Sequence, residues 1–238
     1  MRVLELAWKT PREWAADALE EPLALLADHA WCELGAASAA QGLVARHPDV
    51  EPLCAALIPL AAEELRHFRR VERLLRARGG KLETARRNPY AEGLLAKVER
   101  TQALLDRLLV CALIEARSLE RFTLLAEETE DLELAAFFAE LGPAEAAHAS
   151  LFLELAHELF PADAGAPERV AARLGRWVAR EARLIQGLPR GARIHSGWAG
   201  WAGWAGRFEL LPKAEQEDEP PFELRPRRTD ERPTEIPT

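Results

Sequence analysis

The chain has 238 residues, of which 48% are hydrophobic, so it is long enough to form one large domain with a substantial core. Acidic residues outnumber basic ones, 39 to 31, and the resulting net charge of −8 argues against a chain whose whole surface binds nucleic acid. We expect a cytoplasmic protein that does not cross a membrane, because no run of about 18 apolar residues occurs and the three cysteines form no disulfide framework.

The composition and periodicity predict an all-α protein. Leu, Ala, Glu and Arg dominate, and these residues favour helices. The fourth predicted helix contains Gly142-Pro143, where we expect a kink or a restart. Helices of about 30 residues are roughly 45 Å long, and several of them in one chain predict an antiparallel four-helix bundle with an extra C-terminal helix. The predicted helices span about Arg12–Arg46, Val50–Arg78, Ala91–Thr129, Leu132 to just before Pro161, and Pro167–Gln186.

The character of the chain changes after Pro189. Residues 197–206 form the short tandem repeat GWAGWAGWAG, in which we identify no chemistry. From Glu215 onward the sequence is rich in proline and charge, a composition that cannot bury enough apolar surface to order itself alone. We therefore predict a bundle domain over residues 1–189 and a poorly ordered segment over residues 190–238.

The sequence EELRHF at positions 63–68 places Glu64 and His67 three residues apart on the second predicted helix. Residues at this spacing share one helix face, and this pair continues an apolar stripe that runs through Leu57 and Leu60. A single pair of this kind is usually a surface pair. However, Glu145 and His148 repeat the pattern on the apolar stripe of the fourth predicted helix.

One inward-facing glutamate also lies on each of the other two long helices. Glu33 occupies an alanine-rich face of the first, and Glu115 follows Leu108 and Cys111 on the third. Four buried carboxylates would repel one another at high cost unless cations neutralise them. One Glu from each of two helices and Glu-x-x-His from each of the other two form the ligand set of a dinuclear metal centre in a helical bundle. The candidate metal ligands are Glu33, Glu64, His67, Glu115, Glu145 and His148.

Carboxylates and imidazoles suit iron or manganese, and the ligand types alone leave both open. The other acidic and histidine residues do not belong to a pattern on an apolar stripe that a second helix repeats. We expect His29 at most to support a ligand, and we expect Glu63, Glu120, Glu127 and Glu128 to face solvent or arginines.

Basic residues gather locally on this acidic chain. Residues 66–87 carry nine basic side chains against Glu72 and Glu83, and residues 168–193 carry seven arginines against Glu168 and Glu181. Such a cluster is either a local phosphate-binding surface or a solvated helix face with ordinary ion pairs.

Several segments together resemble the MiaE family of tRNA hydroxylases. They are DHAWCELGAASAA at 28–40, EELRHF at 63–68, IEARSLERFTLLAE at 114–127 and the second Glu-x-x-His motif, in the same order and spacing over roughly residues 20–160. The resemblance implies a ferritin-like fold, two iron ions, dioxygen as co-substrate and an external electron donor. It also implies hydroxylation of the isopentenyl group of 2-methylthio-N6-isopentenyladenosine next to the tRNA anticodon, with the six candidate ligands binding the iron.

The resemblance further implies that Arg117 and Arg121 lie beside the site, where they either pair with ligand carboxylates or contact substrate phosphate. It makes Arg73 and Arg76 candidates for guiding the anticodon arm of tRNA. Two positions depart from the family pattern, because Leu119 replaces a frequent Cys and Ala147 replaces a common Arg.

Two alternatives remain open from the sequence. The first is a ferritin-like di-iron oxidase or peroxidase that acts on iron or peroxide, and the second is a bundle with a structural metal centre that only binds partners.

Overall fold

The computed structural model describes residues 4–85, 87–161 and 169–198, and the prediction of an all-α fold is confirmed. Most of the repeat at 197–206 and all of the predicted tail from Glu215 lie outside the described residues. Along the chain the elements are α1 (Arg12–Leu19), α2 (Pro22–Arg46), α3 (Glu51–Ala77), α4 (Pro89–Leu95), a 3-10 helix (Arg100–Gln102), α5 (Ala103–Glu128), α6 (Leu132–Leu159) and α7 (Arg169–Gly187).

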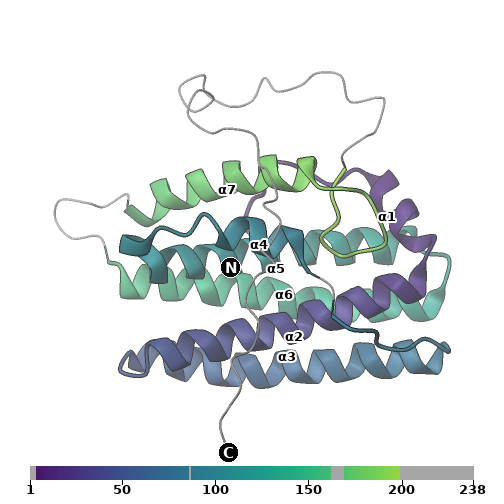
Figure 1. Ribbon diagram of the computed structural model, residues 1–238, viewed down its shortest axis with the longest axis horizontal. Coiled ribbons are helices and arrows are strands. Elements are labelled where there is room, and N and C mark those ends of the chain that lie inside the picture. The colour runs from purple at the N-terminus through teal and green to yellow at the C-terminus, as the bar shows by residue number, and fades with distance from the viewer. Residues whose placement is uncertain (1–3, 86, 162–168, 199–238) are drawn as a thin grey trace, which may run out of the picture. The chain divides into compact units, whose positions relative to one another are not determined.

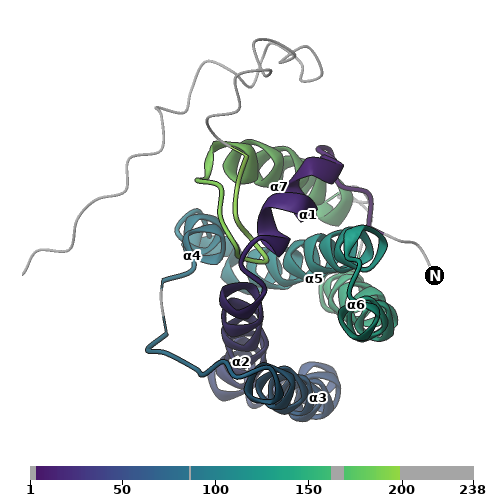
Figure 2. The same cartoon turned by 90° about the vertical axis from the view of Figure 1, so that its right-hand side faces the viewer.

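Two antiparallel hairpins form the bundle, and each pairs consecutive long helices. α2 packs along α3, and α5 packs along α6 (Figure 1). The short helices α1 and α4 and the helix α7 lie on the side of α5 that faces away from α3 (Figure 2). The second hairpin turns sharply because the carboxylate of Asp131 accepts hydrogen bonds from the backbone N–H groups of Glu133 and Leu134, both at 3.0 Å, and so caps α6.

The first predicted helix is in fact two helices, α1 and α2. Pro22 lacks an N–H group and disfavours helical backbone at the residue before it, and Glu21 adopts φ −125° and ψ 68°. The proline therefore starts a new helix instead of continuing the old one, as is common for proline in a first helical turn.

The third predicted helix is also divided, because α4 ends at Leu95 and α5 begins at Ala103. The carboxylate of Asp106 accepts a hydrogen bond from the backbone N–H of Glu99 at 2.9 Å and holds the intervening turn. Asp106 is itself fixed by Arg173 and by the indole N–H of Trp177, so α7 stabilises the break.

The restart expected at Gly142-Pro143 does not occur, because α6 is one helix through Pro143. A residue before proline normally avoids helical backbone, in part because its Cβ clashes with the proline ring. Gly142 has no Cβ, which relieves this clash. α3 likewise continues through Pro59, which follows Ile58, so an internal proline ends neither helix.

The buried side chains form two apolar clusters, and the candidate ligands of α2, α3 and α6 lie between them along each helix. On α3, Leu57 belongs to one cluster and Val71 to the other, and Glu64 lies midway. On α6, Phe138 and Phe152 occupy the two clusters on either side of the second Glu-x-x-His motif. The fold thus places one polar layer between two dry layers, where a ligand side chain has little freedom to move.

The described part of the segment after Pro189 belongs to the same compact unit as the bundle, so the predicted domain boundary lies too early. Ile194 is fully buried in the cluster that contains Trp14, and His195 is 5% exposed. Among the described residues, none of the helices is long and apolar enough to cross a membrane.

Candidate metal centre

All six predicted ligand residues are buried and meet in the middle of the bundle. α2 supplies one, α3 two, α5 one and α6 two, as predicted from the helix faces. The exposed fractions are 4% for Glu33, 1% for Glu64, 6% for His67, 5% for Glu115, 3% for Glu145 and 3% for His148.

The six side chains form two groups, each with two carboxylates and one imidazole. Within each group, one potential ligand atom from every residue lies within 4.8 Å of the others. Two groups of this composition could each hold one cation. The first group is Glu33, His67 and Glu145, and the second is Glu64, Glu115 and His148.

The Glu64 carboxylate lies between the two groups. Its Oε1 is 2.8 Å from His148 Nδ1, and its Oε2 is 3.4 Å from His67 Nδ1. His67 Nδ1 also lies 3.5 Å from Oε2 of Glu33. Both imidazoles therefore present Nδ1 to the carboxylates, and Glu64 is placed to contact cations in both groups.

Without a cation, the centre holds four carboxylates and only two imidazoles, so its negative charges are not balanced. Burial and then the negative charges of Glu145 and Glu64 raise the pKa of Glu115 well above its usual value. Burial and the charge of Glu33 do the same to Glu145. Burial opposes the charge of His67, yet the nearby carboxylates of Glu33 and Glu64 raise its pKa to about 10. The metal-free centre therefore holds protons where a cation would otherwise neutralise the carboxylates.

Unpartnered buried atoms show that the residues fit a metal centre. Nδ1 of His67, Nδ1 of His148 and Oε1 of Glu64 are buried and have no hydrogen-bond partner of good geometry, although the last two are close together. Buried polar atoms normally have partners, and both Nδ1 atoms lie close to the Glu64 carboxylate. A divalent cation in each group would satisfy them.

His29 lies directly behind the Glu33 ligand. Its Nε2 is 2.5 Å from Oε1 of Glu33, and the imidazole is fully buried beside the rings of Phe122 and Phe138. Its position four residues before Glu33 on α2 is the sequence signal for this contact. His29 thus holds one oxygen of Glu33, in keeping with the expectation that it at most supports a ligand.

Arg117 does not pair with the ligand carboxylates. The resemblance implied either such an ion pair or a contact with substrate phosphate, and the position of Arg117 fits neither role. The side chain is fully buried, and its guanidinium donates to both oxygens of Glu181 on α7, at 2.8 and 2.9 Å, and to Glu120. A buried side chain with these partners cannot reach substrate phosphate. Arg117 instead joins α5 to α7.

Arg121 is likewise fully buried and has a structural position. Its guanidinium donates to the backbone carbonyls of Ile194 and Ser196, at 2.6 and 2.7 Å, and lies 4.2 Å from the ring centre of Trp14. These contacts hold residues 194–196 against α5. We therefore correct the assignment of Arg117 and Arg121 as substrate contacts.

Arg73 and Arg76 are exposed on α3, as a phosphate-binding surface requires. Arg76 pairs with Glu72 on the same helix, whereas Arg73 has no ion pair within the described part of the chain. Arg66 and Arg69 are also exposed on this helix, so several guanidinium groups face solvent beyond the His67 ligand.

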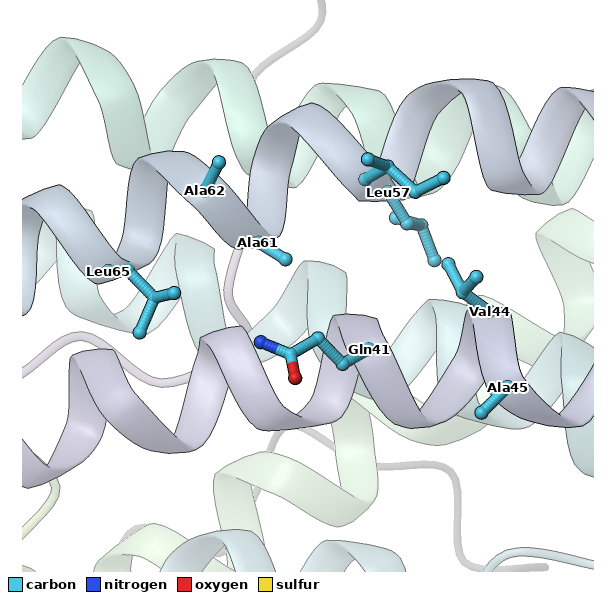
Figure 3. Close-up of a pocket in the computed structure, with 8 residues that line it drawn as sticks. Gln41, Val44, Ala45, Leu57, Ala61, Ala62 and Leu65 are labelled. Carbon is cyan, nitrogen blue, oxygen red and sulfur yellow. The ribbon is translucent and has the colours of Figure 1, made fainter.

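A separate apolar pocket of about 350 Å³ lies between α2 and α3 (Figure 3). Gln41 and Val44 line it from α2, and Leu57, Ala61 and Leu65 line it from α3. None of the six candidate ligands lines this pocket, so its walls are distinct from the metal centre.

Comparisons with known proteins identify the family of this chain. Residues 2–196 match the family model described as tRNA-(MS[2]IO[6]A)-hydroxylase (MiaE). The tRNA 2-(methylsulfanyl)-N(6)-isopentenyladenosine(37) hydroxylase of Pseudomonas putida is 37% identical over 194 residues, which are 81% of this chain and 92% of that protein. The Salmonella typhimurium enzyme of the same name is 34% identical over 143 residues, 59% of this chain and 50% of that protein.

A solved structure shares the fold. It is described as protein 43 with aldehyde deformylating oxygenase activity from Synechococcus, and it matches with a TM-score of 0.76 and 36% identity over 83% of this chain and 97% of that one. Its similarity supports the ferritin-like di-iron fold. The family match spans all four ligand helices and the buried segment after α7, and the chain therefore belongs to the MiaE family of tRNA hydroxylases.

Proposed function

We propose that this protein is a dioxygen-dependent di-iron monooxygenase that hydroxylates the isopentenyl group of 2-methylthio-N6-isopentenyladenosine in tRNA. The observation that carries the proposal is the pair of facing ligand groups, each with two carboxylates and one imidazole, in a chain that belongs to the MiaE family. We place the reaction in the cytoplasm, which suits three cysteines that are all free.

The six ligands have defined tasks in this reaction. Glu33, His67 and Glu145 would hold one iron ion, and Glu64, Glu115 and His148 the other. When bound, the two irons supply the redox chemistry by which dioxygen, two electrons and two protons convert a C–H bond to C–OH and release one water. The electrons come from an external donor.

The protein's contribution is to orient the ligands and to exclude water. Glu33 is held from behind by His29, and the apolar clusters on either side of the centre keep bulk water from the buried carboxylates. In this low-dielectric setting the carboxylates interact strongly with a bound cation. The ligand geometry is thereby fixed before the substrate arrives.

The tRNA is expected to bind across the exposed arginines of α3. Arg73 lies six residues after the His67 ligand, about 9 Å along the helix axis. An anticodon loop exposes its bases, so a modified adenosine can leave the loop and approach the centre. Since phosphate contacts release counterions, binding through this surface should weaken steeply with salt.

Charge reversal tests this surface. Replacing Arg73 and Arg76 with Glu should weaken tRNA binding at low salt and reduce the slope of log K against log salt by about 1 for each lost phosphate contact. Iron binding should be unchanged. Reversal of Arg12, which is 68% exposed on α1, is a suitable control for a change in net charge. Unaltered tRNA affinity at low salt would exclude this surface.

The decisive experiment is mass spectrometry of tRNA nucleosides. The protein is loaded with ferrous iron and incubated with reductant, air and tRNA that bears the methylthio-isopentenyl adenosine. We expect that nucleoside to gain one oxygen atom. The gain should vanish in Glu115→Ala and persist in Glu72→Ala, whose side chain pairs with Arg76 on the outside of α3.

The solved structural relative suggests a second candidate activity, because its description names aldehyde deformylating oxygenase activity. The same iron-loaded protein should therefore be incubated with a long-chain aldehyde in a parallel reaction. Hydrocarbon product without nucleoside oxidation would favour that activity over tRNA hydroxylation. Oxygen consumption that needs only ferrous iron would instead favour an iron oxidase.

A further inference from the structure

Glu63, the residue before the Glu64 ligand, faces the two ligand imidazoles from the solvent side. Its Oε2 is 3.5 Å from Nε2 of His148, and its Oε1 is 3.9 Å from Nε2 of His67. Glu63 is partly open to solvent, as expected, with 40% of its side chain exposed, but its partners are these imidazoles instead of arginines. Its nearest charged partners are imidazoles that belong to two different helices, α3 and α6, which are neighbours in the bundle (Figure 2).

The orientation of the imidazoles defines what Glu63 can do. Both rings direct Nδ1 to the ligand carboxylates, and a nitrogen that binds a metal must be free of a proton. The proton of each neutral ring must then be on Nε2, the atom that faces Glu63. The two ring centres are 5.9 Å apart. One carboxylate between them can therefore accept a hydrogen bond from each ring, one with each oxygen.

Glu63 differs from an ordinary surface glutamate because the two rings that it faces are buried. Its side chain is 40% exposed, whereas the side chains of His67 and His148 are 8% and 4% exposed. Nε2 of His148 is buried and has no hydrogen-bond partner of good geometry, although it points to Glu63 at slightly more than hydrogen-bond distance. Within the described part of the chain, Glu63 forms no ion pair with an arginine, and its charged neighbours are the two imidazoles.

We propose that Glu63 is a positioning residue that accepts the Nε2–H groups of His67 and His148, one with each carboxylate oxygen. A carboxylate behind a metal-binding histidine fixes its tautomer and ring orientation and makes it a better ligand. Because His67 and His148 belong to different ligand groups, Glu63 supports both metal positions at once. It also connects this buried pair of rings to solvent.

The inference rests on the metal centre but not on the identity of the substrate, so metal binding alone tests it. Co²⁺ is titrated into the metal-free protein, and absorbance gives the affinities of the two positions. Loss of a partner behind a ligand histidine typically weakens metal binding by about 10–100-fold. We expect a weakening of this size at both positions in Glu63→Ala. Glu63→Gln keeps one acceptor oxygen and should lie between Glu63→Ala and the parent.

Proton NMR of the Co²⁺ protein reports the hydrogen bonds directly. The parent should show two strongly shifted, solvent-exchangeable resonances from the Nε2–H groups of His67 and His148. In Glu63→Ala both should move or broaden through faster exchange with water. Glu72→Gln, on the same helix, is the matched control and should leave the affinities and both resonances unchanged. Thermal unfolding of the metal-free variants checks that each one is folded.

The possible outcomes distinguish the role of Glu63 from the existence of the metal centre. Affinities within twofold of the parent, with both resonances unmoved, would overturn the role of Glu63 and leave the centre intact. A loss confined to one position would overturn its shared role. A folded parent that binds no Co²⁺ would overturn the metal centre, and this inference with it.

Discussion

Replacement of Arg117 by Met tests whether this arginine is structural, as its position indicates. The guanidinium is fully buried and donates to both oxygens of Glu181, to Glu120 and to the backbone carbonyl of Trp8. Removal of the cation would leave the Glu181 carboxylate buried with the hydroxyl of Tyr90, at 2.9 Å, as its remaining described hydrogen-bond donor. An isolated buried charge is strongly unfavourable.

The expected cost follows from this geometry. Removing one partner of a buried ion pair typically destabilises a protein by about 3–5 kcal/mol. For a protein of this size, 1 kcal/mol corresponds to roughly 2–4 °C in Tm, so we expect Arg117→Met to lower Tm by roughly 6–20 °C. Differential scanning calorimetry of the metal-free protein measures this directly.

Two further variants make the test specific. The double variant Arg117→Met/Glu181→Gln removes both charges and keeps an acceptor for Tyr90, so it should regain more than half of the lost stability. Arg12→Met breaks an exposed pair with Glu128 and should cost about 1 kcal/mol or less. A Tm for Arg117→Met that equals that of Arg12→Met would refute the structural role. Metal content should be the same in all three variants.

Other consequences concern pH and metal. Burial, and then the charges of Arg121 and Arg117, hold the pKa of His195 well below its usual value, so the folded protein should lose stability as pH falls below about 6.5, where the unfolded chain gains this proton. Urea unfolding should show a smaller loss between pH 6.5 and 5 in His195→Gln than in the parent. Addition of metal at 100 times Kd should stabilise the protein by about 2.7 kcal/mol for each occupied position, and calorimetry should show a smaller gain in Glu145→Ala, which keeps only the second ligand group intact. Because the ligands must lose protons to bind a cation, metal affinity measured by titration should rise from pH 6 to pH 8.

The burial and convergence of the six candidate ligands were predictable from sequence because each of them continues an apolar stripe. Glu64 and His67 interrupt a run of buried leucines on α3, and a helix repeats its faces every three to four residues. Burial of a carboxylate at such a position has few physical solutions, so four of them in one bundle point to cations. Grouping the six residues into two sets required the structure, since it depends on how the two hairpins meet.

The roles of Glu63 and Arg117 were not predictable in the same way. Glu63 is adjacent to a ligand and lies near the edge of the apolar stripe, where a helical pattern does not separate a solvent-facing residue from one that faces a buried ring. Arg117 was misplaced because its partner, Glu181, is 64 residues away in sequence. A long-range pair of this kind leaves no local pattern. The same applies to the division of the third predicted helix, which depends on contacts of Asp106 with α7.

The metal centre is buried, whereas the arginines proposed to bind tRNA are exposed on α3. This separation bears on which substrate the protein selects. A MiaE relative and a protein with aldehyde deformylating oxygenase activity are similarly close to this chain, at 37% and 36% identity. Both substrates would react at the same metal centre, so discrimination between an anticodon loop and an aldehyde is expected to come from residues outside the six ligands. In this chain the exposed arginines of α3 begin at Arg66, two helical turns before Arg73 and one residue before the His67 ligand. A polyanion can pair with these charges, whereas an uncharged aldehyde gains nothing from them, and their position on the ligand helix α3 therefore favours RNA.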